Sequence, residues 1–166
     1  VVMNAGAYGG ELKDVLTEVT ALFPDGVRTL RGEELALGYR RSLFTDHPEA
    51  VVLRAKLALQ SGSAEQIKAR MDELAAKRRA SQPLERPSAG STFKRPEGYF
   101  AAALIDQCGL KGTRVGGAEV SRKHAGFIVN VGGAKCADVL ALIQKVQDTV
   151  FTATGVTLEP EVKIIQ

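Results

Sequence analysis

The chain has 166 residues and a mass of 17.7 kDa, enough for one ordinary domain or two small ones with a packed core. Hydrophobic residues make up 45% and charged residues 25%, which excludes intrinsic disorder, and no apolar run approaches the roughly 18 residues of a membrane span. Cys108 and Cys136 are too few for a disulfide scaffold and lack metal-ligand spacing. We therefore expect reduced thiols in a cytoplasmic protein without a signal peptide or a membrane partner.

The excess positive charge lies in one segment. Residues 1–65 carry 7 basic and 9 acidic side chains, residues 66–95 carry 8 and 3, and residues 96–166 carry 7 and 7, so their net charges are −2, +5 and 0. A basic segment of this kind favours an anionic partner, although a solvated helix face would explain it equally well. Because no stacking aromatic residues interleave with the cations, a small phosphorylated ligand is favoured over nucleic acid.

The first 62 residues favour strands. The apolar opening at residues 1–3 predicts the end of a strand that enters a glycine-rich turn, as in a chain cut from a longer protein. Pro24-Asp25-Gly26 predicts a hairpin between residues 15–23 and 27–30. A further strand is expected at residues 50–60, ending at Ser61-Gly62.

The remainder alternates helix with strand. Ser63 and Gln66 have the spacing of a capping box, which predicts a helix from residue 63 to about residue 80, with Ile67, Met71 and Leu74 on one face. The other expected elements are an irregular stretch at 82–91, a helix at 99–108 before Gly109, a strand at 127–131, a helix at 137–153 that Gly155 stops, and a terminal strand at 156–166. The helix at 137–153 is amphipathic, and its expected buried face carries Val139, Leu142, Ile143, Val146 and Val150. The sequence therefore predicts an α+β fold with two domains, residues 1–62 and 63–166.

Three polar residues have sequence neighbours that would suit a catalytic or binding role. Ser91 lies between a tight turn and two cations, which would lower the pKa of its hydroxyl and let it donate a proton; a turn serine bonded to its own backbone is the alternative. Arg40 could hold a carboxylate, or be an ordinary surface arginine. Glu161 lies among apolar residues, where a carboxylate marks either a site or an edge strand.

Several familiar motifs are absent from the sequence: a P-loop, a G-x-S-x-G elbow, a G-x-G-x-x-G loop and paired histidines at metal spacing. His47 and His124 stand alone, and each favours a surface or packing role. No metal site is predicted.

Four segments, in this order, resemble the UDP-N-acetylenolpyruvoylglucosamine reductase family. They are Asn4-Ala5-Gly6-Ala7-Tyr8-Gly9, Gly38-Tyr39-Arg40-Arg41-Ser42, Pro87-Ser88-Ala89-Gly90-Ser91-Thr92-Phe93-Lys94-Arg95-Pro96 and Leu158-Glu159-Pro160-Glu161-Val162. The resemblance runs from Asn4 to Ile165 but covers only the C-terminal part of the family. It implies the end of a flavin-binding region, mainly strands, followed by a small α+β substrate-binding domain; the N-terminal FAD-binding lobe would be missing.

The resemblance implies an oxidoreductase of peptidoglycan precursor synthesis, and hence of cell wall biogenesis, cell shape and cell division. In that family NADPH reduces FAD, and the flavin N5 delivers hydride to C3 of the enolpyruvyl group of a UDP-sugar. By this resemblance Ser91 protonates C2, while Arg40 and Glu161 polarise the substrate carboxylate and stabilise the enolate-like intermediate.

The resemblance also implies binding residues. Tyr39, Arg79, Lys94 and Arg95 would contact the substrate, with Arg79 twelve positions before Ser91 facing the UDP diphosphate. Asn4, Gly6 and Ala7 would contact the flavin. Only 39 positions separate Arg40 from Arg79, so the chain resembles the branch that lacks a tyrosine-bearing substrate loop. Two alternatives remain: a flavin-free nucleotide-sugar-binding module, and a basic nucleic-acid-binding domain.

Overall fold

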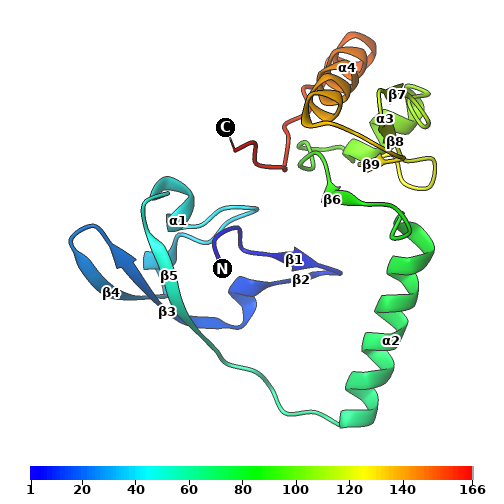
Figure 1. Ribbon diagram of the computed structural model, residues 1–166. Coiled ribbons are helices and arrows are strands. Elements are labelled where there is room, and N and C mark those ends of the chain that lie inside the picture. Colours follow the sequence, from blue (N-terminus) through cyan, green and yellow to red (C-terminus); the bar gives the residue numbers. More distant parts are fainter. Residues whose placement is uncertain (166) are drawn as a thin grey trace. The chain divides into compact units, whose positions relative to one another are not determined.

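The computed structural model describes residues 1–165 and separates the chain into two compact units, Val1–Ser63 and Ala64–Gln166. Figure 1 colours the first unit blue to cyan and the second green to red. Each unit contains helical segments and antiparallel strands, which confirms the predicted α+β class. None of the helices within residues 1–165 is long and apolar enough to cross a membrane.

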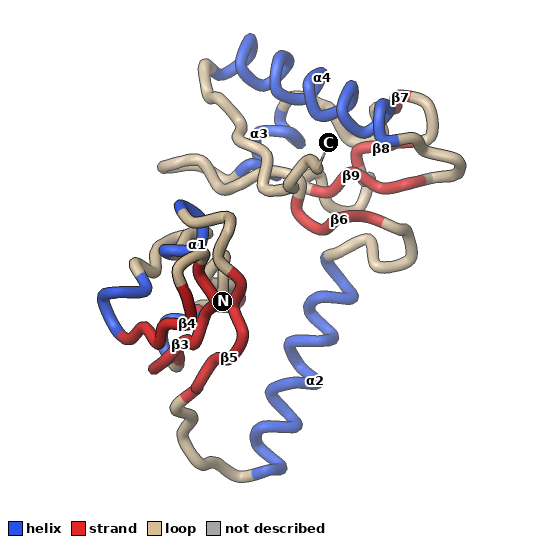
Figure 2. The backbone as a smooth tube through the Cα atoms, turned by 60° about the vertical axis from the view of Figure 1, so that its left-hand side comes forward, coloured by secondary structure: helices blue, strands red, loops and turns tan. Residues whose placement is uncertain are grey.

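A three-stranded antiparallel sheet forms the first unit, with β3 (Leu16–Phe23) between β4 (Gly26–Arg31) and β5 (Val51–Leu57). Phe23 pairs with Gly26 across Pro24-Asp25, so the predicted hairpin is confirmed. The predicted strand at residues 50–60 is also confirmed, although it ends at Leu57. The strands appear red in the tube view of Figure 2.

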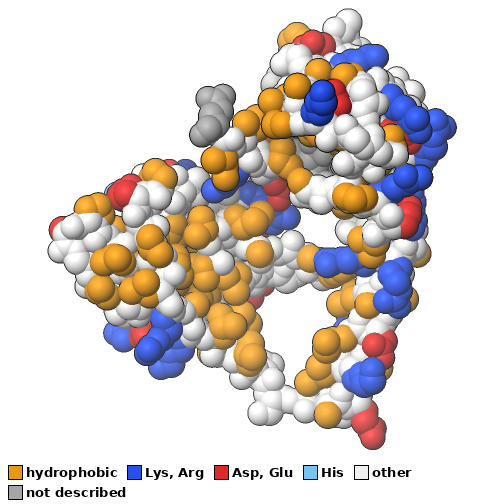
Figure 3. Space-filling model, viewed as in Figure 1, with side chains coloured by type: hydrophobic (Ala, Val, Ile, Leu, Met, Phe, Trp, Pro, Cys, Tyr) orange, Lys and Arg blue, Asp and Glu red, His pale blue; other side chains and the backbone are white. Residues whose placement is uncertain are grey.

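One face of this sheet is buried. Leu16, Val19, Ala21 and Phe23 of β3 pack with Leu35 and Phe44. Leu35 comes from η2 (Gly32–Leu35) and Phe44 from the one-turn helix α1 (Leu43–Asp46). Other large apolar side chains of the three strands are exposed, among them Leu22, Val27, Val51 and Leu53. Orange side chains gather over this sheet in Figure 3.

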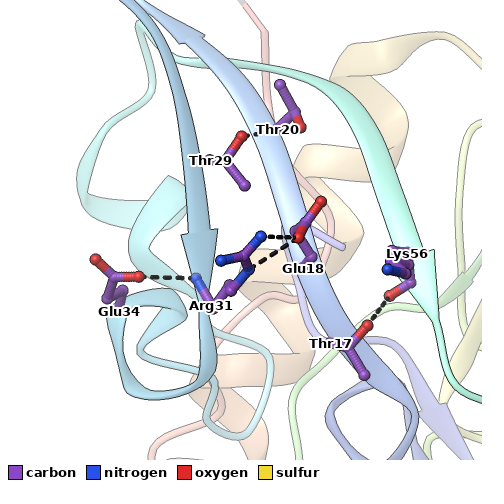
Figure 4. Close-up of polar contacts among 7 residues, drawn as sticks. All are labelled: Thr17, Glu18, Thr20, Thr29, Arg31, Glu34 and Lys56. Atoms are coloured by element: carbon purple, nitrogen blue, oxygen red, sulfur yellow. Dashed lines mark hydrogen bonds and ion pairs between the residues drawn. The ribbon is translucent and has the colours of Figure 1, made fainter.

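Polar pairs join neighbouring strands of the sheet (Figure 4). The Arg31 Nε donates to Glu18 Oε2 at 2.8 Å, and the hydroxyls of Thr20 and Thr29 lie 3.4 Å apart. The hydrogen bond from the Arg31 guanidinium holds the pKa of the Glu18 carboxyl below its usual range. Such exposed cross-strand pairs contribute modestly to stability, and chiefly they favour one register.

The sequence reasoning missed the short elements near the start of the chain. These are β1 (Gly6–Ala7), β2 (Gly10–Glu11) and η1 (Leu12–Asp14). The expected strand end at residues 1–3 is wrong, because these residues form a turn that closes with a 2.9 Å hydrogen bond from Asn4 N to Val1 O. Asn4 has a φ of +43°, a left-handed conformation that reverses the chain and that asparagine tolerates better than most residues.

The second unit begins with α2 (Ala64–Ser81), which confirms the predicted helix; none of its residues is buried. A four-stranded antiparallel sheet follows, in the order β6-β9-β8-β7, and α3 and α4 pack against it. These elements are β6 (Ser88–Ser91), α3 (Ala101–Gln107), β7 (Arg114–Val115), β8 (Ala118–Val120), β9 (Phe127–Asn130) and α4 (Cys136–Thr154).

The predicted apolar face of α4 is confirmed. Leu142, Ile143, Val146 and Val150 are buried against the sheet, and Gly155 ends the helix in a left-handed conformation with a φ of +72°. The helix prediction at 99–108 and the strand prediction at 127–131 hold to within two residues at each end.

A two-residue glycine turn that the sequence reasoning did not use joins β7 to β8. Val115 pairs with Ala118 across Gly116-Gly117, a signature of tight hairpins. A Cβ on Gly117 would lie 2.3 Å from the carbonyl oxygen of Gly132 and 2.4 Å from the nitrogen of Ala134. Only a residue without a side chain fits there.

The expected terminal strand at 156–166 is wrong for the residues described, and Gln166 lies outside them. Between residues 156 and 165 only an isolated bridge forms, joining Phe93 and Pro160. Proline has no N–H to donate to a ladder, so the pairing does not continue as a strand.

Asp138 links the start of α4 to the glycine turn. Its Oδ2 accepts the Lys135 N–H at 2.9 Å and the Gly117 N–H at 3.3 Å, and these bonds lower the pKa of its carboxyl. A carboxyl group whose pKa is lower in the folded than in the unfolded state stabilises the fold at pH values above its ordinary pKa of about 3.9. That stabilisation is lost as the pH falls through the lowered, folded-state pKa. We expect Asp138→Asn to reduce stability at neutral pH and to flatten the acid loss.

Urea unfolding of the wild type and of Asp138→Asn, at neutral and at acid pH, measures how the free energy of unfolding of each depends on pH. Asp148→Asn on the same helix is the matched control, because Asp148 accepts only a side-chain hydrogen bond from Gln144, at 2.8 Å. An unchanged acid dependence in Asp138→Asn would refute the role given to this carboxylate.

Candidate functional site

Most of the predicted residues fall into two groups, one in each unit. The first unit contains what we call the turn group, Asn4, Gly6, Tyr39 and Arg40. The second unit contains what we call the β6 group, which joins the predicted Ser91, Lys94 and Glu161 with Glu159. Each group is described within its own unit.

Tyr39 and Arg40 occupy the two central positions of a tight turn. Gly38 and Arg41 exchange backbone hydrogen bonds of 3.0 and 3.2 Å on either side of them. Arg40 has a φ of +53°, and its guanidinium carbon lies 5.2 Å from the centre of the Tyr39 ring. The Arg40 Nη2 donates to the carbonyl of Gly6 at 3.5 Å, which brings this arginine beside the glycine-rich hairpin.

Asn4 holds this turn in place. Its side chain is fully buried, and its Nδ2 donates to Glu11 Oε2 at 2.6 Å and to the carbonyl of Gly38 at 3.0 Å. Its Oδ1 accepts the Lys13 N–H at 2.9 Å. One amide therefore joins three segments of the chain, and it acts on Arg40 through the turn rather than by direct contact.

Asn4→Ala is expected to destabilise the first unit by about 1–3 kcal/mol, because it leaves buried polar partners unsatisfied. Asn4→Gly is the matched variant, since glycine keeps the left-handed backbone and loses only the amide. Chemical denaturation gives the free energy of unfolding of each. Equal stability of Asn4→Ala and wild type would contradict the assignment.

Backbone pairing assembles the β6 group from distant parts of the sequence. The Glu161 N–H donates to the carbonyl of Thr92 at 2.8 Å, and the Lys94 N–H donates to the carbonyl of Glu159, also at 2.8 Å. Thr92 is buried, and its Oγ1 accepts the Ile128 N–H at 3.2 Å, which fixes this stretch to β9. The structure thus brings the residue next to Ser91 against Glu161.

The side chains of the β6 group combine a hydroxyl, a cation and carboxylates. Ser91 is exposed and Glu161 is half-buried. The Lys94 ammonium pairs with the Glu159 carboxylate. Such a cluster can transfer a proton at an exposed position and can hold an anionic ligand.

Arg95 and Arg79 lie outside the β6 group. The Arg95 guanidinium carbon is 3.9 Å from the centre of the Phe100 ring, and its Nε donates to the carbonyl of Tyr99 at 3.3 Å. Arg79 lies in the last turn of α2, where its carbonyl accepts the Lys123 Nζ at 2.7 Å. This hydrogen bond ties the main chain of Arg79 to Lys123.

The sequence reasoning did not single out Glu159, although the two glutamates that flank Pro160 were a visible signal.

His124 has a packing role, as expected for a lone histidine. It is partly buried, accepts the Gly126 N–H at 3.1 Å with Nδ1 and packs edge-on against Phe127. Burial lowers its pKa, so the neutral ring is favoured. Within residues 1–165, no group of three or more histidine, cysteine, aspartate or glutamate side chains could hold a metal ion.

Comparisons with known proteins give one consistent result. A sequence model described as UDP-N-acetylenolpyruvoylglucosamine reductase, C-terminal domain, matches residues 82–165. The enzyme of that name from Syntrophomonas wolfei is 54% identical over 99% of this chain, and the one from Agathobacter rectalis is 57% identical over 99%. A crystal structure of UDP-N-acetylenolpyruvylglucosamine reductase from Thermus caldophilus superposes with a TM-score of 0.87 at 40% identity, covering 99% of this chain and 58% of that one.

These relatives are all named as reductases, a class of oxidoreductases. It belongs to the UDP-N-acetylenolpyruvoylglucosamine reductase family. The chain spans about half the length of the curated relatives, 55% of the Syntrophomonas protein and 52% of the Agathobacter protein.

Proposed function

We propose that this chain supplies the substrate-binding domain and part of the flavin site of a reductase in peptidoglycan precursor synthesis. The reaction would be the NADPH-dependent, FAD-mediated reduction of UDP-N-acetylglucosamine enolpyruvate to UDP-N-acetylmuramate. The observation that carries the proposal is the pairing of residues 92–94 with residues 159–161, because it brings the segment of Ser91 and Lys94 against Glu161.

The residues of the first unit fit one wall of a flavin site. The hairpin of β1 and β2 exposes glycine backbone, and at Gly9 and Gly10 a Cβ would meet no other atom within 4 Å. A flat ring system could therefore approach the backbone closely there. FAD, when bound and reduced by NADPH, supplies the hydride that adds to C3 of the enolpyruvyl group. An N-terminal lobe of the same protein would complete its site and act as the partner of this chain.

The chain's own residues would bind the anionic substrate and donate the proton. Arg40 and Glu161 would orient the enolpyruvyl carboxylate and stabilise the charge that develops as hydride arrives. Ser91 would donate its proton to C2, and its oxygen would regain a proton from solvent. Tyr39, Lys94, Arg95 and Arg79 would contact the UDP-sugar, and Asn4, Gly6 and Ala7 the flavin.

The test is substrate-dependent NADPH oxidation by the complete protein. We expect Glu161→Gln to lower kcat about 100-fold, the size of effect seen when one catalytic group is removed. Glu65→Gln, an exposed glutamate in the first turn of α2, carries the same charge change and should leave kcat unchanged. UDP-sugar binding without any NADPH oxidation by the wild type would instead support a flavin-free binding module.

A further inference from the structure

A short loop after Ser91 holds the side chain of Arg95 against an aromatic ring. The Arg95 guanidinium carbon lies 3.9 Å from the centre of the Phe100 ring, and the Arg95 Nε donates to the carbonyl of Tyr99 at 3.3 Å. A planar guanidinium suits both contacts, because it can stack on a ring and still donate hydrogen bonds in its own plane. We call this arrangement of Arg95, Tyr99 and Phe100 the Arg95 clasp.

The sequence of the loop explains why the ring and the cation meet. The Tyr99 N–H donates to the carbonyl of Pro96 at 3.2 Å, which closes a β-turn with Gly98 at its third position. Gly98 has a φ of +74°, a positive value that a type II turn requires at this position and that glycine adopts without strain. The turn reverses the chain and brings Phe100 back beside Arg95.

The main chain on the other side of Arg95 is also held. The preceding residue, Lys94, donates its N–H to the carbonyl of Glu159 at 2.8 Å, within the pairing that forms the β6 group. The backbone therefore fixes the base of the Arg95 side chain, and the clasp fixes its charged end. An arginine held in this way loses less conformational entropy on binding a ligand than one that moves freely.

The ring of Phe100 contributes little to packing or to the helix that follows. Its residue is 61% exposed and lies outside the buried core of the second unit. At the start of α3 the carbonyl of Phe100 accepts the N–H groups of Ala103 and Leu104, a task that any residue could perform. The distinguishing feature of this exposed ring is therefore the cation that lies over it.

We propose that Phe100 is a positioning residue for substrate binding. Its ring, together with the Tyr99 carbonyl, holds the Arg95 guanidinium in the orientation in which it meets the anionic substrate. This inference rests on the proposed function, in which Arg95 contacts the UDP-sugar. A ring fixes a guanidinium without neutralising its charge, whereas a carboxylate partner would compensate that charge.

Steady-state kinetics of the complete protein, with the concentration of the UDP-sugar varied, test the proposal. Phe100→Leu keeps an apolar side chain and removes the ring. We expect its KM to rise about two- to fivefold, the loss that corresponds to a cation–π contact at an exposed site. Its kcat should stay at the wild-type value, since Arg95 binds substrate but transfers neither proton nor hydride. Phe100→Tyr keeps the ring and should keep the wild-type KM.

Phe151→Leu is the matched control, because Phe151 on α4 is 56% exposed and also lies outside the core. It should leave KM unchanged. A double-mutant cycle with Arg95→Gln shows whether the ring acts through the arginine, in which case Phe100→Leu adds nothing to the KM of Arg95→Gln. Equal effects of Phe100→Leu in both backgrounds would overturn the proposal. A KM lowered by Phe100→Leu would also overturn it, because the ring would then hold Arg95 away from the substrate.

The geometry of the Arg95 clasp can be measured without turnover. Protons above the face of an aromatic ring resonate upfield, so the Arg95 Nε–H signal in a nitrogen–proton NMR spectrum should move downfield in Phe100→Leu. An unmoved signal would refute the clasp whatever the activity. An active wild type in which Phe100→Leu leaves KM unchanged would refute this inference alone. A moved signal in a protein that does not reduce the UDP-sugar would refute the proposed function, and with it the substrate role of the clasp.

Discussion

Ser91→Ala should slow reduction of the enolpyruvyl substrate by about 100- to 10,000-fold, the range that general acid catalysis contributes. Reduction of the flavin by NADPH should proceed at the wild-type rate, because the proton from Ser91 is needed only at C2 of the substrate. Rapid-mixing absorbance measurements on the complete protein separate the two half-reactions. The variant should therefore accumulate reduced flavin when both substrates are present.

Ser88→Ala is the matched control for this prediction. Ser88 lies at the other end of β6, is also exposed, and uses its hydroxyl oxygen to accept the Gly90 N–H at 3.4 Å. Its loss should leave both half-reactions intact. If Ser91→Ala slowed both half-reactions equally, the serine would be needed for structure or flavin contact and not as the acid.

Gly117→Ala should destabilise the second unit by about 3 kcal/mol, the cost of forcing a side chain into a close-packed site. The atoms in the way are backbone atoms of Gly132 and Ala134, which cannot rotate aside as the end of a flexible side chain could. The turn would have to move, and the Gly117 N–H would leave the Asp138 carboxylate at the start of α4.

Urea unfolding followed by the helical circular dichroism signal measures this loss, because both long helices, α2 and α4, belong to the second unit. Gly10→Ala provides the comparison: Gly10 has open space where its Cβ would stand and lies outside the left-handed region. Similar unfolding midpoints for the two variants would show that the Gly117 contact is relieved at little cost.

Local patterns in the sequence were sufficient to predict the larger elements. The hairpin at Pro24-Asp25, the helix after Ser63 and the apolar face of α4 each depend on residues a few positions apart. The Gly116-Gly117 hairpin carried an equally local signal and was missed because its strands have only two and three residues. Short strands gain their stability from the sheet they join, and not from their own composition.

Local patterns could not predict how the candidate site is assembled. Nothing near Ser91 indicates that residues 159–161 will pair with residues 92–94, since that contact joins segments more than sixty positions apart. The tie from Asn4 to Gly38 is of the same kind, because it depends on a buried amide whose partners come from distant segments. The resemblance to a known family named most of these residues, but not the hydrogen bonds that hold them.

The long-range pairing of Thr92 with Glu161 also has a consequence for the order in which the site forms. Closing a segment of this length carries an entropy cost that local helices and hairpins avoid, so we expect the pairing to form after α2 and the β7-β8 hairpin. On the ribosome, β6 emerges well before the glutamates flanking Pro160 have been translated. Throughout that interval the serine strand has no Glu161 beside it, and the chain can fold locally without yet acquiring its proposed chemistry.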